Sequence, residues 1–113
     1  MSTPDTAPAR LPEPPYYAVI FTAVRTPGDN GYEETSQEML ALAAEQPGYL
    51  GVDTARGENG LGITVSYWRD EESIRAWRRN AEHATAQNQG RKVWYESFAT
   101  HVARVERANS FPR

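Results

Sequence analysis

The stretch YYAVIFTAV, residues 16–24, decides how this chain can fold. It is rich in β-branched and aromatic residues, which favour a strand. Side chains alternate between the two faces of a strand, and both sets are apolar here: Tyr16, Ala18, Ile20 and Val24 on one face, Tyr17, Val19, Phe21 and Ala23 on the other. Because a strand that is apolar on both faces is covered on both faces, we predict a sheet with something packed on each side.

The residues after this strand predict a helix and a β-hairpin. TPGDNG at 26–31 is a turn cluster, and YEETSQEMLALAAEQ at 32–46 is built of helix formers with acids in the first turn, which suit the helix dipole. Pro47 ends this helix because it cannot continue the hydrogen-bond ladder. YLGVDTARG at 49–57 and LGITVSYW at 61–68 read as two strands, and the Asn-Gly pair between them indicates a hairpin.

A second helix and a last strand complete the chain. Asp70 is a suitable N-cap, and the inward side of the helix that follows is expected to carry Ile74, Trp77, Ala81 and Ala84. Alternation from about residue 93 to residue 106 predicts the last strand.

The order strand, helix, strand, strand, helix, strand is that of a ferredoxin-like βαββαβ domain of the α+β class. Its antiparallel sheet carries both helices on one face. Since the first strand is apolar on both faces, the other face needs a cover of its own, and a second copy of the sheet supplies one. We therefore expect a homodimer.

Composition limits the other possibilities. The chain has 113 residues, a net charge of −3 and a pI near 5.4, which argue against a nucleic-acid partner. A mean hydropathy of −0.71 and the lack of a signal-peptide profile lead us to expect a soluble cytoplasmic protein without a membrane partner. No cysteine is present, and no His, Asp or Glu spacing suggests a metal site.

The domain is expected to span residues 16–108. Residues 1–15 hold five of the eight prolines and predict a disordered tail, and residues 109–113 form a short C-terminal tail.

Three segments together resemble the antibiotic biosynthesis monooxygenase (ABM) domain family: SYWRDEESIRAWRRNAEH at 66–83, QPGYLG at 46–51 and VARVER at 102–107. The resemblance extends from Tyr16 to Arg107. It implies a dimeric α/β barrel with a pocket between the sheet and the helices of each subunit. Known roles in the family include oxygenation of polycyclic aromatic or quinol substrates without metal or flavin, and degradation of haem.

The haem-degrading pattern fits poorly. Such members carry an Asn in the first strand, a Trp in the second helix and a haem-ligating His about three helical turns after that Trp. Trp77 matches the Trp, but His83 follows it by only six residues and the strand at 16–25 has no Asn. We therefore expect no cofactor and keep haem as the disfavoured alternative.

His83 is the candidate catalytic residue, since a histidine can act as a general base toward a phenol near neutral pH. On a continuous helix it lies about 180° from Ile74 and about 240° from Trp77, which points it away from the inward side. A break near Asn80 would turn it toward the pocket, and an exposed or packing histidine is the plainer interpretation.

The candidate substrate-binding residues are Trp68, Trp77, Asn80, Tyr67 and Trp94. Their aromatic rings could form a flat-walled cavity for an aromatic molecule, or they could simply fill the core. Trp94 and Tyr95 should point to opposite faces of the last strand.

Three functions remain open from the sequence. They are a cofactor-independent monooxygenase acting on an aromatic or quinol-like molecule, a haem-binding or haem-degrading protein, and a non-catalytic ligand-binding or structural dimer.

Overall fold

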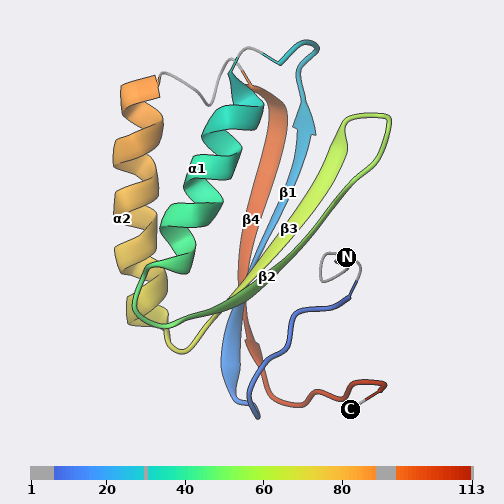
Figure 1. Ribbon diagram of the computed structural model, residues 1–113, viewed down its shortest axis with the longest axis vertical. Helices are drawn as coiled ribbons and strands as arrows, with labels where there is room; N and C mark the ends of the chain where they lie inside the picture. The colour runs from blue at the N-terminus through green and yellow to red at the C-terminus, as the bar shows by residue number, and fades with distance from the viewer. Residues whose placement is uncertain (1–6, 30, 89–93, 113) are drawn as a thin grey trace.

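The computed structural model describes residues 7–29, 31–88 and 94–112, with only the helical backbone for residues 82–88. Its elements follow the predicted order (Figure 1). They are β1 (Tyr16–Arg25), α1 (Tyr32–Ala44), β2 (Tyr49–Arg56), β3 (Leu61–Trp68), α2 (Glu71–Asn88) and β4 (Tyr95–Val105).

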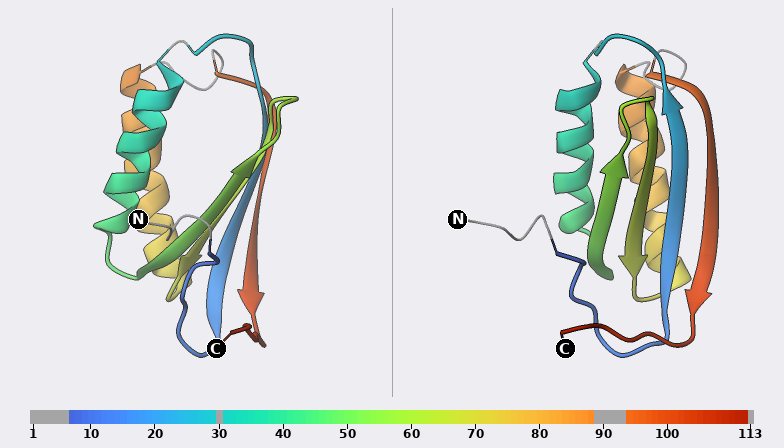
Figure 2. Two further views of the ribbon diagram at one scale, coloured as in Figure 1. Left: turned by 45° about the vertical axis from the view of Figure 1, so that its right-hand side comes forward. Right: turned by 90° about the vertical axis from the view of Figure 1, so that its right-hand side faces the viewer.

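The four strands form one antiparallel sheet in the order β2-β3-β1-β4. Both helices lie on the same face of this sheet, as the two side views show (Figure 2). The predicted ferredoxin-like α+β fold is therefore confirmed. The first strand in the sequence is an inner strand of the sheet, paired with β3 on one side and β4 on the other.

The alternation of β1 puts apolar side chains on both faces of the sheet. Val19, Phe21 and Ala23 face the helices, whereas Tyr16 and Ala18 are buried on the opposite face, which we call the outer face. The stretch with apolar side chains on both faces, residues 16–24, thus belongs to an inner strand that has β3 on one side and β4 on the other.

Part of the outer face is covered by the chain itself. Residues 7–15 pass close to β2, where the amide of Ala9 donates to Oδ1 of Asp53 at 2.9 Å. The Tyr67 hydroxyl donates to Oδ2 of the same carboxylate at 3.0 Å. The predicted disorder of the tail concerns residues 1–15, of which 1–6 lie outside the described residues.

Local sequence signals account for the turns. Gly60 closes the hairpin between β2 and β3 with a φ of 91°, a conformation that glycine adopts without strain. Asp70 caps α2 as expected, because its Oδ1 accepts a hydrogen bond from the amide of Ser73 at 2.8 Å.

The main core lies between the sheet and the two helices. Its centre is formed by Ala43 of α1, Trp68 of β3 and Ile74 of α2. The Trp68 side chain is fully buried, and its Nε1 donates to the Ser66 hydroxyl at 2.9 Å. Burial of a ring of this size stabilises the fold by about 2 to 3 kcal/mol, and the hydrogen bond removes the cost of burying the indole N–H.

Several large apolar side chains stay exposed. Leu61 and Ile63 of β3 lie beside β1 at 41% and 43% exposure, and Phe98 and Val102 of β4 are exposed to a similar degree. Within the described part of the chain, no helix is long and apolar enough to cross a membrane.

Candidate functional site

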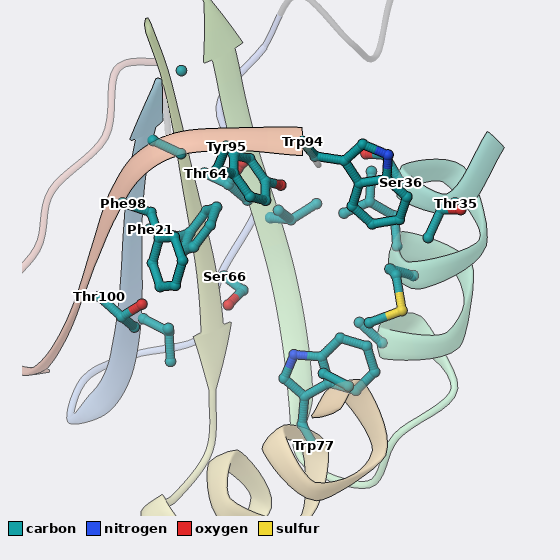
Figure 3. Close-up of a pocket in the computed structure, with 18 of the residues that line it drawn as sticks. Phe21, Thr35, Ser36, Thr64, Ser66, Trp77, Trp94, Tyr95, Phe98 and Thr100 are labelled. Atoms are coloured by element: carbon teal, nitrogen blue, oxygen red, sulfur yellow. The ribbon is translucent and has the colours of Figure 1, made fainter. Parts of the chain in front are cut away.

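A cavity of about 310 Å³ lies between the helix-facing side of the sheet and the two helices (Figure 3). This volume is at the lower end of the range for small-molecule pockets. The sheet contributes Phe21, Thr64, Ser66, Phe98 and Thr100 to its lining. The helices contribute Thr35, Ser36, Met39, Leu40 and Trp77, and Trp94 and Tyr95 close one end.

Aromatic rings dominate the walls of this cavity. Phe21 lies 5.4 Å from Phe98 and 5.5 Å from Tyr95 between ring centroids. Trp77 reaches in from α2 on the other side (Figure 3). These distances are those of favourable aromatic pairs, so the walls offer flat, apolar surfaces to a flat, apolar ligand.

Two of the five predicted substrate-binding residues, Trp77 and Trp94, line the cavity. The other three do not. Trp68 lies behind Trp77, with its ring stacked on it at 6.1 Å. Tyr67 points to the outer face, toward Asp53, and Asn80 is exposed and donates to Gln46 at 3.0 Å.

The predicted base, His83, belongs to α2, which runs without interruption from Glu71 to Asn88. The helix therefore has no break near Asn80. The side chain of His83 lies outside the described residues, and its catalytic role stays a prediction.

The prediction that Trp94 and Tyr95 point to opposite faces of the last strand is wrong, because both side chains line the cavity. The simple alternation fails for two reasons. Trp94 precedes β4, which begins at Tyr95. In addition, the pairing of β1 with β4 shifts its register between Val24 and Arg25, so that Tyr95 pairs with Arg25 while Val24 pairs with Ser97.

One end of the cavity is polar, and the sequence patterns gave no sign of it. Arg56, the last residue of β2, lines the cavity and donates from Nη2 to the Tyr32 hydroxyl at 2.6 Å. Tyr32 opens α1 and lies against Tyr95, with 5.9 Å between ring centroids. Arg25 stacks on the Tyr32 ring, with its Cζ 3.6 Å from the centroid. We call these four residues the Arg-Tyr cluster.

The phenol of Tyr95 is held in its neutral form. Burial raises its pKa most, and the neighbouring Tyr32 raises it further through its charge and through hydrogen bonding, while the two arginines act in the opposite direction. Tyr95 is therefore a hydrogen-bond donor at neutral pH, with no capacity to act as a base there.

The expectation of no cofactor stays a prediction. β1 has no asparagine and Trp77 lines the cavity, whereas the side chain of His83, the third position of the haem-degrading pattern, lies outside the described residues. No group of three His, Asp or Glu side chains in the described ranges is arranged to hold a metal ion.

Comparison with solved structures supports the same fold. A mutant form of SnoaB, a cofactor-independent oxygenase from Streptomyces nogalater, superposes with a TM-score of 0.67 at 14% identity, covering 88% of this chain and 100% of that one. PA3566 from Pseudomonas aeruginosa gives a TM-score of 0.63 at 18% identity, covering 86% of this chain and 98% of its own.

Sequence relatives are nearer. The uncharacterized protein YqjZ of Bacillus subtilis is 52% identical over 103 residues, which is 91% of this chain and 90% of YqjZ. The jasmonate monooxygenase ABM of Pyricularia oryzae is 39% identical over 46 residues, 41% of this chain and 21% of that protein. The antibiotic biosynthesis monooxygenase family model matches residues 15–89. On this evidence, the chain belongs to the antibiotic biosynthesis monooxygenase family.

Proposed function

We propose that the chain is a cofactor-independent monooxygenase that oxidises an aromatic or quinol-like small molecule. The observation that carries this proposal is the aromatic-walled cavity between sheet and helices in a member of a monooxygenase family. The descriptions of SnoaB as a cofactor-independent oxygenase and of the fungal relative as a monooxygenase agree with it.

The chemistry we propose needs only the substrate, dioxygen and a base. Removal of a proton from the bound phenol or enol gives an electron-rich anion that reacts with dioxygen. The substrate loses two hydrogens in all, the hydroxyl proton and one from the carbon that is oxidised; that carbon gains one oxygen atom and the second oxygen atom leaves as water, so the substrate supplies all the electrons. We assign the base to His83, and we assign the exclusion of water to the half-buried rings of Trp77 and Phe21.

Oxygen consumption by the purified protein tests this function. A panel of phenols, hydroquinones and fused-ring enols is supplied with isotopically heavy dioxygen, and the products are examined by mass spectrometry. We expect one heavy oxygen atom in the organic product and one in water. A panel that shows no protein-dependent uptake of oxygen and no labelled product would overturn the proposal.

The two histidines provide matched variants for the base. We expect His83→Ala to lower the rate by about 100-fold or more, as the loss of a general base does. His101→Ala changes an exposed histidine on the outer face of β4, away from the cavity, and should leave the rate unchanged when measured at equal dimer content. Equal rates for His83→Ala and the unmodified protein would remove His83 from the scheme while leaving the oxygenase function standing.

We also infer that the active form is a homodimer, packed through the outer faces of two sheets. The exposed Leu61 and Ile63, beside the inner strand β1, supply an apolar surface for such a contact.

A further inference from the structure

We propose that the Arg-Tyr cluster is a subsite for an anionic oxygen, so that the substrate is an aromatic molecule carrying a carboxylate or an ionised phenol. This inference rests on the same cavity as the proposed function and adds the chemical class of the molecule that enters it. The position of Arg56, the charges around it and the shape of the cavity support it.

The guanidinium of Arg56 is held in a fixed position. It lies over Gly62, where an added Cβ would come within 2.9 Å of Nη1 and 3.0 Å of Cζ. Its Nη1 donates to the Gly60 carbonyl at 3.3 Å and its Nη2 to the Tyr32 hydroxyl at 2.6 Å. The absence of a side chain at Gly62 thus makes room for a cation at the cavity wall.

Among the described residues, neither arginine at this end of the cavity forms an ion pair. The hydrogen bonds described for Arg25 go to backbone carbonyls, those of Trp94 at 3.1 Å, Gly28 at 3.0 Å and Asp29 at 3.5 Å. Within the described ranges, neither Arg25 nor Arg56 has a carboxylate oxygen within 4.0 Å. Two guanidinium groups flank one phenol ring, and like charges repel. An anion bound here would offset that repulsion.

Hydrogen-bond donors remain for such an anion. A guanidinium carries five N–H groups, and the described contacts of Arg56 use one on each terminal nitrogen. The hydroxyl of Tyr95, which lines the cavity next to Tyr32, is already hydrogen-bonded to Tyr32, so the donors that remain are those of the Arg56 guanidinium. Arginine pairs strongly with carboxylate and with other anionic oxygens through parallel hydrogen bonds.

The shape of the cavity sets the direction of the ligand. Arg56 is exposed, so the charged end of the site is at the rim, where water can still reach an anion. The half-buried rings of Phe21 and Trp77 line the cavity from the sheet and from α2 (Figure 3). A ligand that places its rings against these aromatic side chains and its anionic oxygen beside Arg56 would make favourable contacts with both.

Calorimetric titration in oxygen-free buffer tests the subsite without any turnover. Naphthoate is compared with its uncharged counterpart naphthamide, and naphthol with methoxynaphthalene, so the first pair reports on a carboxylate and the second on a phenol. We expect Arg56→Gln to weaken binding of at least one oxygen acid by roughly tenfold or more, as the loss of a charge-assisted hydrogen bond does. Its uncharged counterpart should bind with unchanged affinity.

Two further variants separate position from charge. Gly62→Ala keeps the charge of Arg56 but displaces its guanidinium, so it should weaken the same oxygen acid by a smaller factor. Arg75→Gln removes an exposed arginine of α2 that does not line the cavity and should have no effect. Thermal unfolding of each variant verifies that the fold is intact.

The inference is overturned if the unmodified protein binds neither oxygen acid, if Arg56→Gln keeps both affinities, or if it loses the charged and uncharged ligands equally. These outcomes are independent of the oxygenase assay. Charge-selective binding with no oxygen uptake would leave the subsite standing and remove the proposed reaction. Oxygen uptake without charge-selective binding would do the opposite.

Discussion

At the scale of single residues, Tyr67 was predicted to line the cavity from its residue type, but its side chain lies on the other face of the sheet. It is an aromatic residue next to a tryptophan, as the predicted cavity required, but neighbouring residues of a strand face opposite sides. Since Trp68 fills the core, Tyr67 must face the outer side, where it donates to Asp53. Alternation alone would have excluded it from a pocket that contains Trp77.

The environment of Tyr67 makes the stability of the protein sensitive to high pH. Burial and the hydrogen bond to Asp53 raise its pKa from 10.0 to about 12. The folded state therefore holds this proton more tightly than the unfolded state. The resulting stabilisation is complete below pH 10 and is lost as the pH rises toward 12.

We expect Tyr67→Phe to lower the free energy of unfolding by about 1 kcal/mol at neutral pH, the usual contribution of such a hydrogen bond. The difference between the unmodified protein and the variant should then shrink between pH 10 and 12. Urea unfolding at a series of pH values measures it. Tyr17→Phe, on the helix-facing side of β1, is the control, and a difference that stays constant through this window for Tyr67→Phe would contradict the assignment.

At the scale of elements, the fold was predictable because each boundary has a local cause. The predicted first strand begins at Tyr16 as expected and runs one residue beyond the stretch 16–24, the hairpin turns at Gly60, and Asp70 caps α2. Arg56 and Gly62 are cross-strand partners in the predicted hairpin, but Tyr32 opens α1. The polar end of the cavity was not predictable, because only the tertiary arrangement brings Tyr32 to the hairpin.

The sequence patterns also did not predict the contact between the turn before β2 and the start of α2. Gly48, in the turn before β2, has a φ of 86°, and an added Cβ would lie 2.6 Å from Cβ of Ser73. The Gly48 carbonyl accepts a hydrogen bond from the amide of Arg69 at 2.8 Å. The turn between α1 and β2 is therefore packed directly on the start of α2.

Two glycine variants separate backbone strain from crowding at this contact. Gly31 has nearly the same φ, 84°, but an added Cβ there would meet nothing within 4 Å. We expect Gly31→Ala to cost roughly 1 kcal/mol, the left-handed penalty alone. Gly48→Ala should cost about 1 to 3 kcal/mol more, because it also overpacks the contact with Ser73. If urea unfolding gave the same loss of stability for Gly31→Ala and Gly48→Ala, the predicted overpacking against Ser73 would be contradicted.

At the scale of the whole molecule, the outer face of the sheet is the surface that the fold leaves incomplete. The segment at residues 7–15 covers it near β2, but Ile63, the third residue of β3, stays 43% exposed. A stable protein interface buries about 800 Å² on each partner, and a sheet face is a surface of that scale.

We expect Ile63→Glu to convert a dimer into a monomer, because it places a charge in the apolar centre of the proposed contact. Ala41→Glu adds the same charge to the exposed side of α1 and should leave the dimer intact. Size-exclusion chromatography with light scattering gives the mass of each variant. A monomeric unmodified protein, or a dimeric Ile63→Glu variant, would contradict the sheet-to-sheet arrangement.

The strand order has a consequence for how the protein is made. β1 is synthesised first, yet its two neighbours arrive late, β3 from the middle of the chain and β4 from its end. While the ribosome is still adding residues 95–105, one edge of this apolar strand has no partner strand to bond. Nascent chains that stall before β4 would expose unpaired backbone N–H and C=O groups along β1, which can pair with other chains. The eleven residues of β4 therefore cover the edge of the ten residues of β1. A chain that lacks β4 should be bound by chaperones or degraded, and should not form a smaller folded domain.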